Sequence, residues 1–173
     1  MNLEDLPKDC IRTNSGIFMN IFNPTPEMFC IEDIAHSLAA QPRFAGHLNR
    51  HYSVAQHSVL AARMAKKKNK LATLLHDSTE AFILDMPSPI KARMPEYKEF
   101  ERVLMLAIAS KFKIQYPFDK EVKKIDKIMI HLEWENLVNN NNKKFKCWSQ
   151  KKAKRKFLKM YYELTTKEYE KSY

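Results

Sequence analysis

Apolar residues recur every three or four positions over most of the chain after residue 30, and this spacing constrains the fold more than any other feature. Ile31, Ile34 and Leu38, for example, lie on one side of a helix, because an α-helix makes one turn every 3.6 residues. The pattern predicts an all-α fold. The helices expected from it span residues 31–40, 54–65, 70–83, 95–112, 120–138 and 150–171.

Residues with defined roles at helix ends support these boundaries. Ser53 stands where a helix N-cap is expected, and Pro95 stands in a first helical turn, where proline is well tolerated. The run Asp-Met-Pro-Ser-Pro at 85–89 ends one helix, and four consecutive asparagines at 139–142 end another. We expect residues 139–146 to form an exposed loop.

The first 26 residues differ from the rest, because short apolar pieces alternate there with turn residues. Asn-Ser-Gly at 14–16 and Asn-Pro-Thr-Pro at 23–26 favour a small β-hairpin or an extended arm. The whole chain, 1–173, is predicted to be a single domain. It comprises an N-terminal arm (1–26), a helical core (27–138) and a basic C-terminal helix (143–173).

Composition excludes several classes of protein. No run approaches the ~18 uninterrupted apolar residues of a membrane helix, and the polar, acidic start does not resemble a signal peptide. Three widely spaced cysteines without a CxxC pattern favour a reducing, cytoplasmic location. Only two glycines are present, which rules out a P-loop and a GxGxxG dinucleotide turn.

The net charge of +10 is concentrated near the C-terminus. Of the 30 Lys and Arg residues, 11 lie within 143–173, together with only three acidic residues. The rest of the chain is nearly balanced. The basic excess is therefore remote from the candidate site described next.

Two histidines and two aspartates are candidate ligands for one divalent metal ion: His57, His76, Asp77 and Asp126. Imidazole suits Mn, Fe, Co, Ni and Zn, and carboxylate adds a hard oxygen that also suits Mg. Asp126 and Glu133 lie on an apolar helix face, where a carboxylate is costly to bury unless it is paired or bound to metal. A single histidine on an apolar face is more often an ordinary core residue, but here the candidates come from three predicted helices.

The pattern H…HD…D resembles the HD-domain superfamily of metal-dependent phosphohydrolases. The segments YSVAQHS, LLHDSTEAFILDMPSPIK and IEDIAHSLAAQPRFAGH, with the spacing from Asp126 to Glu133, are similar to one branch of it. That branch contains bacterial 5′-deoxynucleotidases and small phage-encoded nucleotide phosphohydrolases of the dATP type. The resemblance covers residues 31–137 and implies an HD-domain helical bundle that forms a homo-oligomer.

The resemblance also implies roles for individual residues. His57, His76, Asp77 and Asp126 would bind the metal. Glu80 would position or deprotonate the attacking water, and Asp85 would lie near the sugar and the scissile phosphate. The substrate-binding residues that it implies are Arg43 and Lys91 at the phosphate and Phe44, where relatives often have Trp, at the base.

The expected function is hydrolysis of (deoxy)nucleotide 5′-phosphates by metal-activated water. A monophosphate would yield nucleoside and phosphate, and a triphosphate such as dATP would yield nucleoside and triphosphate. A nucleotide substrate is expected as a partner, whereas a membrane or a nucleic acid is not. Two-His, two-Asp sites accept several metals, so Mn, Co, Ni, Fe, Zn and Mg all remain candidates.

Simpler roles stay open for several of these residues. Arg43 also suits a surface salt bridge, Lys91 a solvated position, Phe44 the core and Asp85 a turn. Glu133 suits either a hydrogen bond to a ligand histidine or a pair with a lysine. A different function is a nucleic-acid-binding or scaffolding protein with a vestigial HD site. Its surface would be the basic C-terminal segment with its interleaved aromatic residues Phe145, Trp148, Phe157, Tyr161 and Tyr162.

Overall fold

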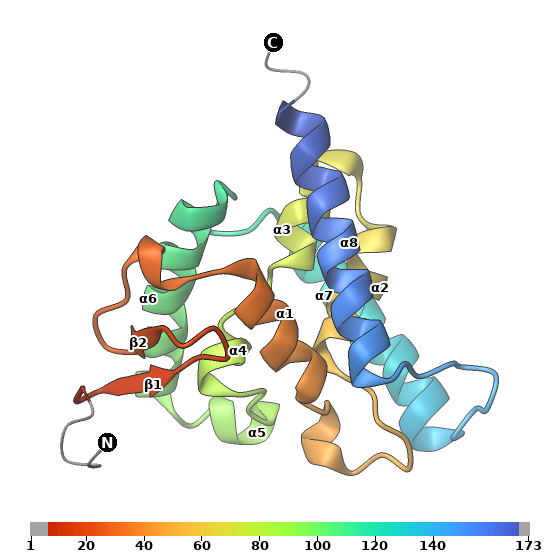
Figure 1. Ribbon diagram of the computed structural model, residues 1–173. Helices are drawn as coiled ribbons and strands as arrows, with labels where there is room; N and C mark the ends of the chain where they lie inside the picture. The colour runs from red at the N-terminus through yellow and green to blue at the C-terminus, as the bar shows by residue number, and fades with distance from the viewer. Residues whose placement is uncertain (1–6, 170–173) are drawn as a thin grey trace.

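The computed structural model describes residues 7–169, and it is mostly helical with a short hairpin near the N-terminus (Figure 1). The coarse prediction of a helical fold with an N-terminal hairpin is confirmed. The strands are β1 (Cys10–Arg12) and β2 (Phe18–Asn20). The helices are α1 (Ile31–Ala40), α2 (Val54–Met64), α3 (Lys70–Leu74), α4 (Glu80–Ile83), α5 (Ser88–Lys91), α6 (Pro95–Phe112), α7 (Lys120–Glu133) and α8 (Gln150–Tyr169).

The hairpin is antiparallel, and Ile11 pairs with Met19 at its centre. Gly16 has φ +92 in the connecting turn, a left-handed conformation that glycine adopts without strain. Met19 is fully buried, so the hairpin contributes to the core. Its turn is held to α1 by Asp33, which accepts hydrogen bonds from the Ser15 amide (2.8 Å) and hydroxyl (2.6 Å).

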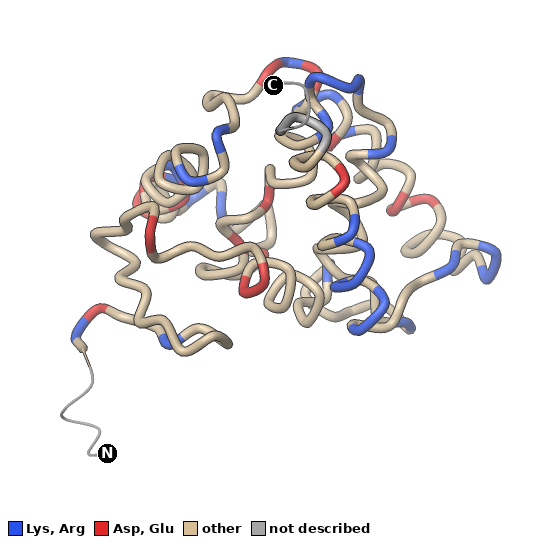
Figure 2. The backbone as a smooth tube through the Cα atoms, turned by 45° about the horizontal axis from the view of Figure 1, so that its top comes forward, with Lys and Arg blue, Asp and Glu red and all other residues tan. Residues whose placement is uncertain are grey.

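Helix α8 lies across α1, α2 and α3, and its inward face completes the core (Figure 1). Ala153 and Phe157 are fully buried there, and Trp148, just before the helix, is 9% exposed. Most of the described basic side chains of α8 and of the loop before it are exposed, and Figure 2 marks where these residues lie along the backbone. The predicted end of this helix at Lys171 lies outside the described residues.

The predicted helix over residues 70–83 is wrong as a continuous element, because the chain turns between α3 and α4. The His76 imidazole Nδ1 lies 2.7 Å from the Thr73 carbonyl oxygen. In a continuous helix that carbonyl would accept the Asp77 amide, so the side chain competes with the helical bond. Tight turns follow, in which the Glu80 amide donates to the Asp77 carbonyl.

Helix α7 packs against α2 through a small apolar cluster formed by Ala61, Ala65, Ile125 and Met129. Its regular part ends at Glu133, and a π-helical segment, Trp134–Asn139, continues it to the predicted stop. The helices 31–40 and 95–112 have the predicted bounds. None of the described helices combines the length and apolarity needed to cross a membrane.

Candidate metal centre

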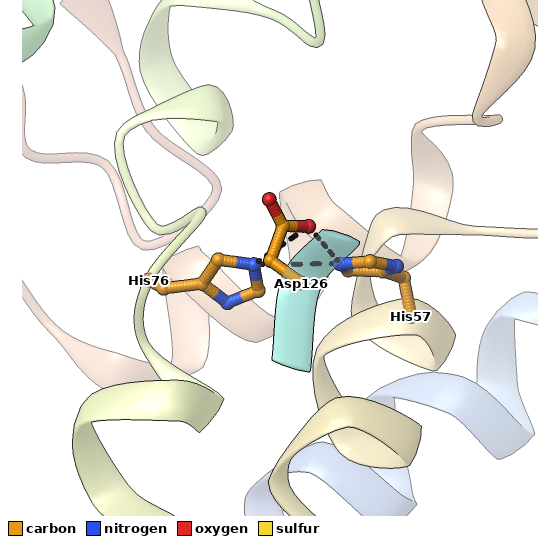
Figure 3. Close-up of side chains that lie close together, drawn as sticks. All are labelled: His57, His76 and Asp126. Atoms are coloured by element: carbon orange, nitrogen blue, oxygen red, sulfur yellow. Dashed lines mark hydrogen bonds and ion pairs between the residues drawn. The ribbon is translucent and has the colours of Figure 1, made fainter. Parts of the chain in front are cut away.

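Three of the predicted ligands meet at one point. The potential ligand atoms of His57, His76 and Asp126 all lie within 4.8 Å of one another. His57 comes from α2, His76 from the turn after α3 and Asp126 from α7, and the three side chains point toward one another (Figure 3). The two imidazole Nε2 atoms are 3.3 Å apart, and Asp126 Oδ1 lies 3.3 Å from His57 Nε2 and 3.6 Å from His76 Nε2.

The fourth predicted ligand, Asp77, borders the same point. Its Oδ1 lies 3.3 Å from His76 Nε2, and its Oδ2 lies 3.6 Å from His57 Nε2. Because Asp77 directly follows His76, the turn that breaks the helix presents both side chains to the site. All four predicted ligands therefore gather around the two imidazole rings.

Local structure explains how each ligand is oriented. The Ser53 hydroxyl caps α2 by accepting from the Gln56 amide, which begins the helix one turn before His57. His57 is fully buried on the inward face of α2. Asp126 neighbours Ile125, which packs against α2, so the contact between the two helices brings Asp126 to His57.

Both histidines use Nδ1 for protein hydrogen bonds and leave Nε2 for the site. His57 Nδ1 lies 2.6 Å from Glu133 Oε1, and His76 Nδ1 lies 2.7 Å from the Thr73 carbonyl. A proton on each Nδ1 satisfies these acceptors, and the Nε2 lone pairs then face each other. Such an arrangement requires a positive charge between them, from a metal ion or from an added proton.

The pKa shifts of His76 and Asp126 also indicate that a positive charge is needed between the two imidazoles. Burial lowers the pKa of His76, but Asp77 and Asp126 outweigh it and raise that pKa to about 9. Burial likewise raises the pKa of Asp126, but hydrogen bonds from His57 and His76 bring it well below its ordinary value. Without a metal, a proton on the imidazole balances the carboxylates, and a divalent cation would displace that proton.

Glu133 connects the ligands to the interior. It is fully buried, and its Oε1 accepts from His57 Nδ1 and from the Tyr52 hydroxyl, each at 2.6 Å. Its Oε2 accepts from Arg43 Nε at 3.1 Å. Burial raises the pKa of Glu133, but His57 and Arg43 lower it overall, so the group is a carboxylate. Of the two roles open to Glu133, the structure selects the hydrogen bond to the candidate ligand His57.

Glu80 lies near these ligands but has an incomplete set of partners. It is 7% exposed, and within residues 7–169 its buried Oε2 has no hydrogen-bond partner. Burial, together with the charges of Asp77 and Asp85, raises its pKa well above the ordinary value. A buried carboxyl group with a raised pKa and a free oxygen is suited to accept a proton.

The sequence has clear relatives. Over 127 residues the chain is 37% identical to YfdR, an uncharacterized protein of Escherichia coli K12, and the alignment covers 73% of this chain and 71% of YfdR. The chain belongs to the YfdR family. An uncharacterized protein of Rhodobacter capsulatus is 34% identical over 141 residues, covering 73% of this chain and 72% of that protein. No protein-family model matches the chain.

In this member of the YfdR family, Arg43 is a buried part of the centre rather than a surface residue. Its Nη1 lies 3.7 Å from Asp77 Oδ2, in addition to the Nε bond to Glu133. Phe44, which follows it, is half-buried, with its ring 5.8 Å from the Arg43 guanidinium and 6.1 Å from the ring of Trp134. Phe44 has φ 55, a left-handed conformation that is strained for a bulky residue and that re-aims the chain after Arg43.

Lys91 and Asp85 are held by protein groups other than the imidazoles. The Lys91 ammonium pairs with Glu101 on α6 and lies 5.7 Å from the ring of Tyr97. The Asp85 amide is held by the Gln41 side chain at 3.2 Å, and burial raises the pKa of the Asp85 carboxyl. Both groups are thus held by protein contacts at the edge of the centre.

Two contributors were missed from the sequence. Tyr52 binds Glu133, and the only signal was its position beside the cap residue Ser53. Thr73 orients His76 through its backbone carbonyl, which no side-chain pattern reveals. Spacing does offer a hint, since a side chain can reach a carbonyl three residues earlier.

Proposed function

We propose that this protein is a metal-dependent phosphohydrolase of the HD-domain superfamily that acts on (deoxy)nucleotide 5′-phosphates. One observation carries the proposal: ligand atoms of His57, His76 and Asp126, from three separate elements, lie within 4.8 Å of one another. Chance convergence of two imidazoles and a carboxylate, with Asp77 alongside, is improbable in a chain with six histidines.

The donor set fits a first-row divalent cation. Imidazole nitrogen and carboxylate oxygen suit Mn, Fe, Co, Ni and Zn. The hydrogen bond that His57 donates to Glu133 is the kind of outer contact that orients ligand histidines. Bound there, such a cation supplies Lewis acidity toward phosphoryl oxygens and lowers the pKa of water. The two acidic ligands also match its charge.

The chain's own residues support the remaining chemistry. Glu80 accepts the proton of the attacking water, because its raised pKa and its oxygen without a hydrogen-bond partner suit it to take up a proton. Arg43 contributes a fixed positive charge beside Asp77, where the phosphoryl group carries negative charge. Lys91 would reach the phosphate only after leaving Glu101.

The alternative of a nucleic-acid-binding protein with a vestigial site has weaker support. Two of the aromatic residues that alternate with the basic ones, Phe157 and Trp148, are buried in the core and are unavailable to stack on bases. The ring of Tyr161 packs against Phe112, 5.7 Å away. The basic residues and Tyr162, which is 46% exposed, remain as the candidate polyanion surface.

The test is an assay of purified protein against deoxynucleoside mono- and triphosphates with Mn, Co, Ni, Fe, Zn or Mg. We expect release of phosphate from monophosphates or of triphosphate from triphosphates, loss of release on chelation and recovery on adding the metal back. A protein that binds metal yet releases neither product from any nucleotide would exclude the proposed function.

A further inference from the structure

A cavity of about 210 Å³ lies beside the metal centre, between α6, α7 and the loop that joins them. It is smaller than the roughly 300–1,000 Å³ typical of pockets for drug-sized ligands, so it suits a ring or a sugar rather than a large molecule. It is lined by two ligands, His76 and Asp126, and by Thr79, Glu101, Met105, Tyr116, Pro117, Phe118, Val122 and Lys123.

The cavity lies on the accessible side of the ligands. The side chain of His57 is 0% exposed, whereas those of His76 and Asp126 are 7% and 32% exposed and both border the cavity. A group bound to a metal at this centre can therefore extend past His76 and Asp126 into the cavity, but not past His57. Arg43 and Phe44 are not among the described residues that line it.

The walls suit an aromatic ring with polar edges. The Tyr116 and Phe118 rings meet edge to face, with centroids 5.2 Å apart, and Met105 and Val122 add buried apolar surface. Glu101 and Lys123 bring opposite charges to the same cavity. A few polar groups among apolar and aromatic walls are typical of a small-molecule site.

We propose that this cavity holds the nucleoside part of the substrate, with Tyr116 and Phe118 against the base or sugar, while the phosphate lies at the metal centre. The inference rests on the proposed function and refines it. It places the nucleoside between α6 and α7, away from Phe44, the residue that the family resemblance implies for the base. Substrate preference would then depend on the loop between these helices.

The test compares two substrates in two variants. Val122→Phe fills the cavity from α7, and Phe118→Ala removes one aromatic wall. The substrates are the deoxynucleoside 5′-monophosphates and 2-deoxyribose 5-phosphate, which has the same phosphate ester but no base. Phe22→Ala, at an exposed phenylalanine that does not line the cavity, is the matched control.

We expect both cavity variants to lower kcat/KM for the nucleotides about tenfold or more, because Val122→Phe fills the cavity and Phe118→Ala removes a ring on which a base can stack. Hydrolysis of 2-deoxyribose 5-phosphate and the affinity for Co(II) should change less than about twofold, and the control should leave both substrates unaffected. Equal losses for both substrates, or no loss for the nucleotides, would overturn the inference.

A second measurement separates this inference from the proposed function. If the metal-loaded protein hydrolyses neither these substrates nor deoxynucleoside triphosphates, the proposed function fails. Equilibrium dialysis of deoxynucleoside monophosphates with the Co(II)-loaded protein then decides the site. Binding that is lost in Val122→Phe and kept in Phe22→Ala supports the cavity, whereas absent or unchanged binding rejects it.

Discussion

The metal centre and helix α8 handle charge in opposite ways. At the centre, the buried imidazole of His57 on α2 contacts both Asp126 and Glu133 on α7, so each carboxylate has a partner from a different element. On α8 basic residues outnumber acidic ones, and most of the described basic side chains are exposed. Figure 2 marks the positions of these residues along the backbone. The centre is thus a place where removing one group leaves another without a partner.

Lys156 illustrates the other arrangement. Slight burial, Arg63 and Lys152 lower its pKa, and its ammonium lies 5.1 Å from the ring of Trp148. The repulsion between these positive charges costs little free energy on the exposed surface of α8, because water and salt screen it. The comparison predicts large, specific effects at the centre and small, salt-dependent effects on α8, and the following experiments test it in that order.

The largest effect is expected from removing a ligand. His76→Ala should lower metal affinity more than about a hundredfold and abolish hydrolysis, because even outer-shell contacts of metal ligands are worth 10–100-fold. His131→Ala, at an exposed histidine on α7, is the matched control and should leave both properties unchanged. Metal titration by calorimetry provides the measurement, and equal affinity in the two variants would contradict a metal site at His76.

Glu80→Gln should lower turnover about 10²–10⁴-fold while metal binding persists, since it removes the proton acceptor but no ligand. In the wild type, turnover should fall as pH decreases through the raised pKa of Glu80, because the protonated carboxyl cannot accept a proton. A profile flat down to the ordinary glutamate pKa of 4.5 would exclude Glu80 as the base.

The same substitution should stabilise the metal-free protein at neutral pH. The folded state raises the pKa of Glu80, so it binds a proton more tightly than the unfolded state does. The negative charge of Glu80 therefore lowers the free energy of unfolding once the pH rises above 4.5, the pKa of glutamate in the unfolded chain. Urea unfolding of Glu80→Gln and wild type at two pH values measures this, and a glutamine variant less stable than wild type at pH 7 would contradict it.

Glu133→Gln should weaken metal binding about 10–100-fold, because it weakens the hydrogen bond that orients His57 and removes the charge facing Arg43. Glu163→Gln on α8, where the carboxylate is more than half exposed, is the control and should have no effect. Unchanged metal affinity in Glu133→Gln would show that His57 is held by packing alone.

The smallest effect is expected on α8. Replacing Lys152 and Arg155 with Gln should change the free energy of unfolding by less than about 0.5 kcal/mol and leave hydrolysis unchanged, since both side chains are exposed. Elution from heparin should shift to lower salt, because fewer cations contact the polyanion. A loss of hydrolysis in this variant would contradict the contrast between the two regions, because it would show that the charges of α8 affect the metal centre.

Periodicity and capping residues alone determined most helices. The bounds of α1 and α6 follow from apolar spacing and, for α6, from Pro95, because these signals act between neighbours in the chain. Apolar spacing and capping residues could not predict the end of the helix after α3. It depends on the His76 imidazole binding the Thr73 carbonyl, a choice between two local bonds that depends on what surrounds the imidazole.

The candidate site also combines features that the sequence indicates with features that only the tertiary structure decides. Residue types and spacing identified His57, His76, Asp77 and Asp126 as candidate ligands, because imidazole and carboxylate are the side chains that bind such metals. Only the tertiary structure decided that Glu133 joins His57, Tyr52 and Arg43, and that a cavity opens beside His76 and Asp126. These contacts bring together residues far apart in the chain, and their partners are chosen by how the helices pack.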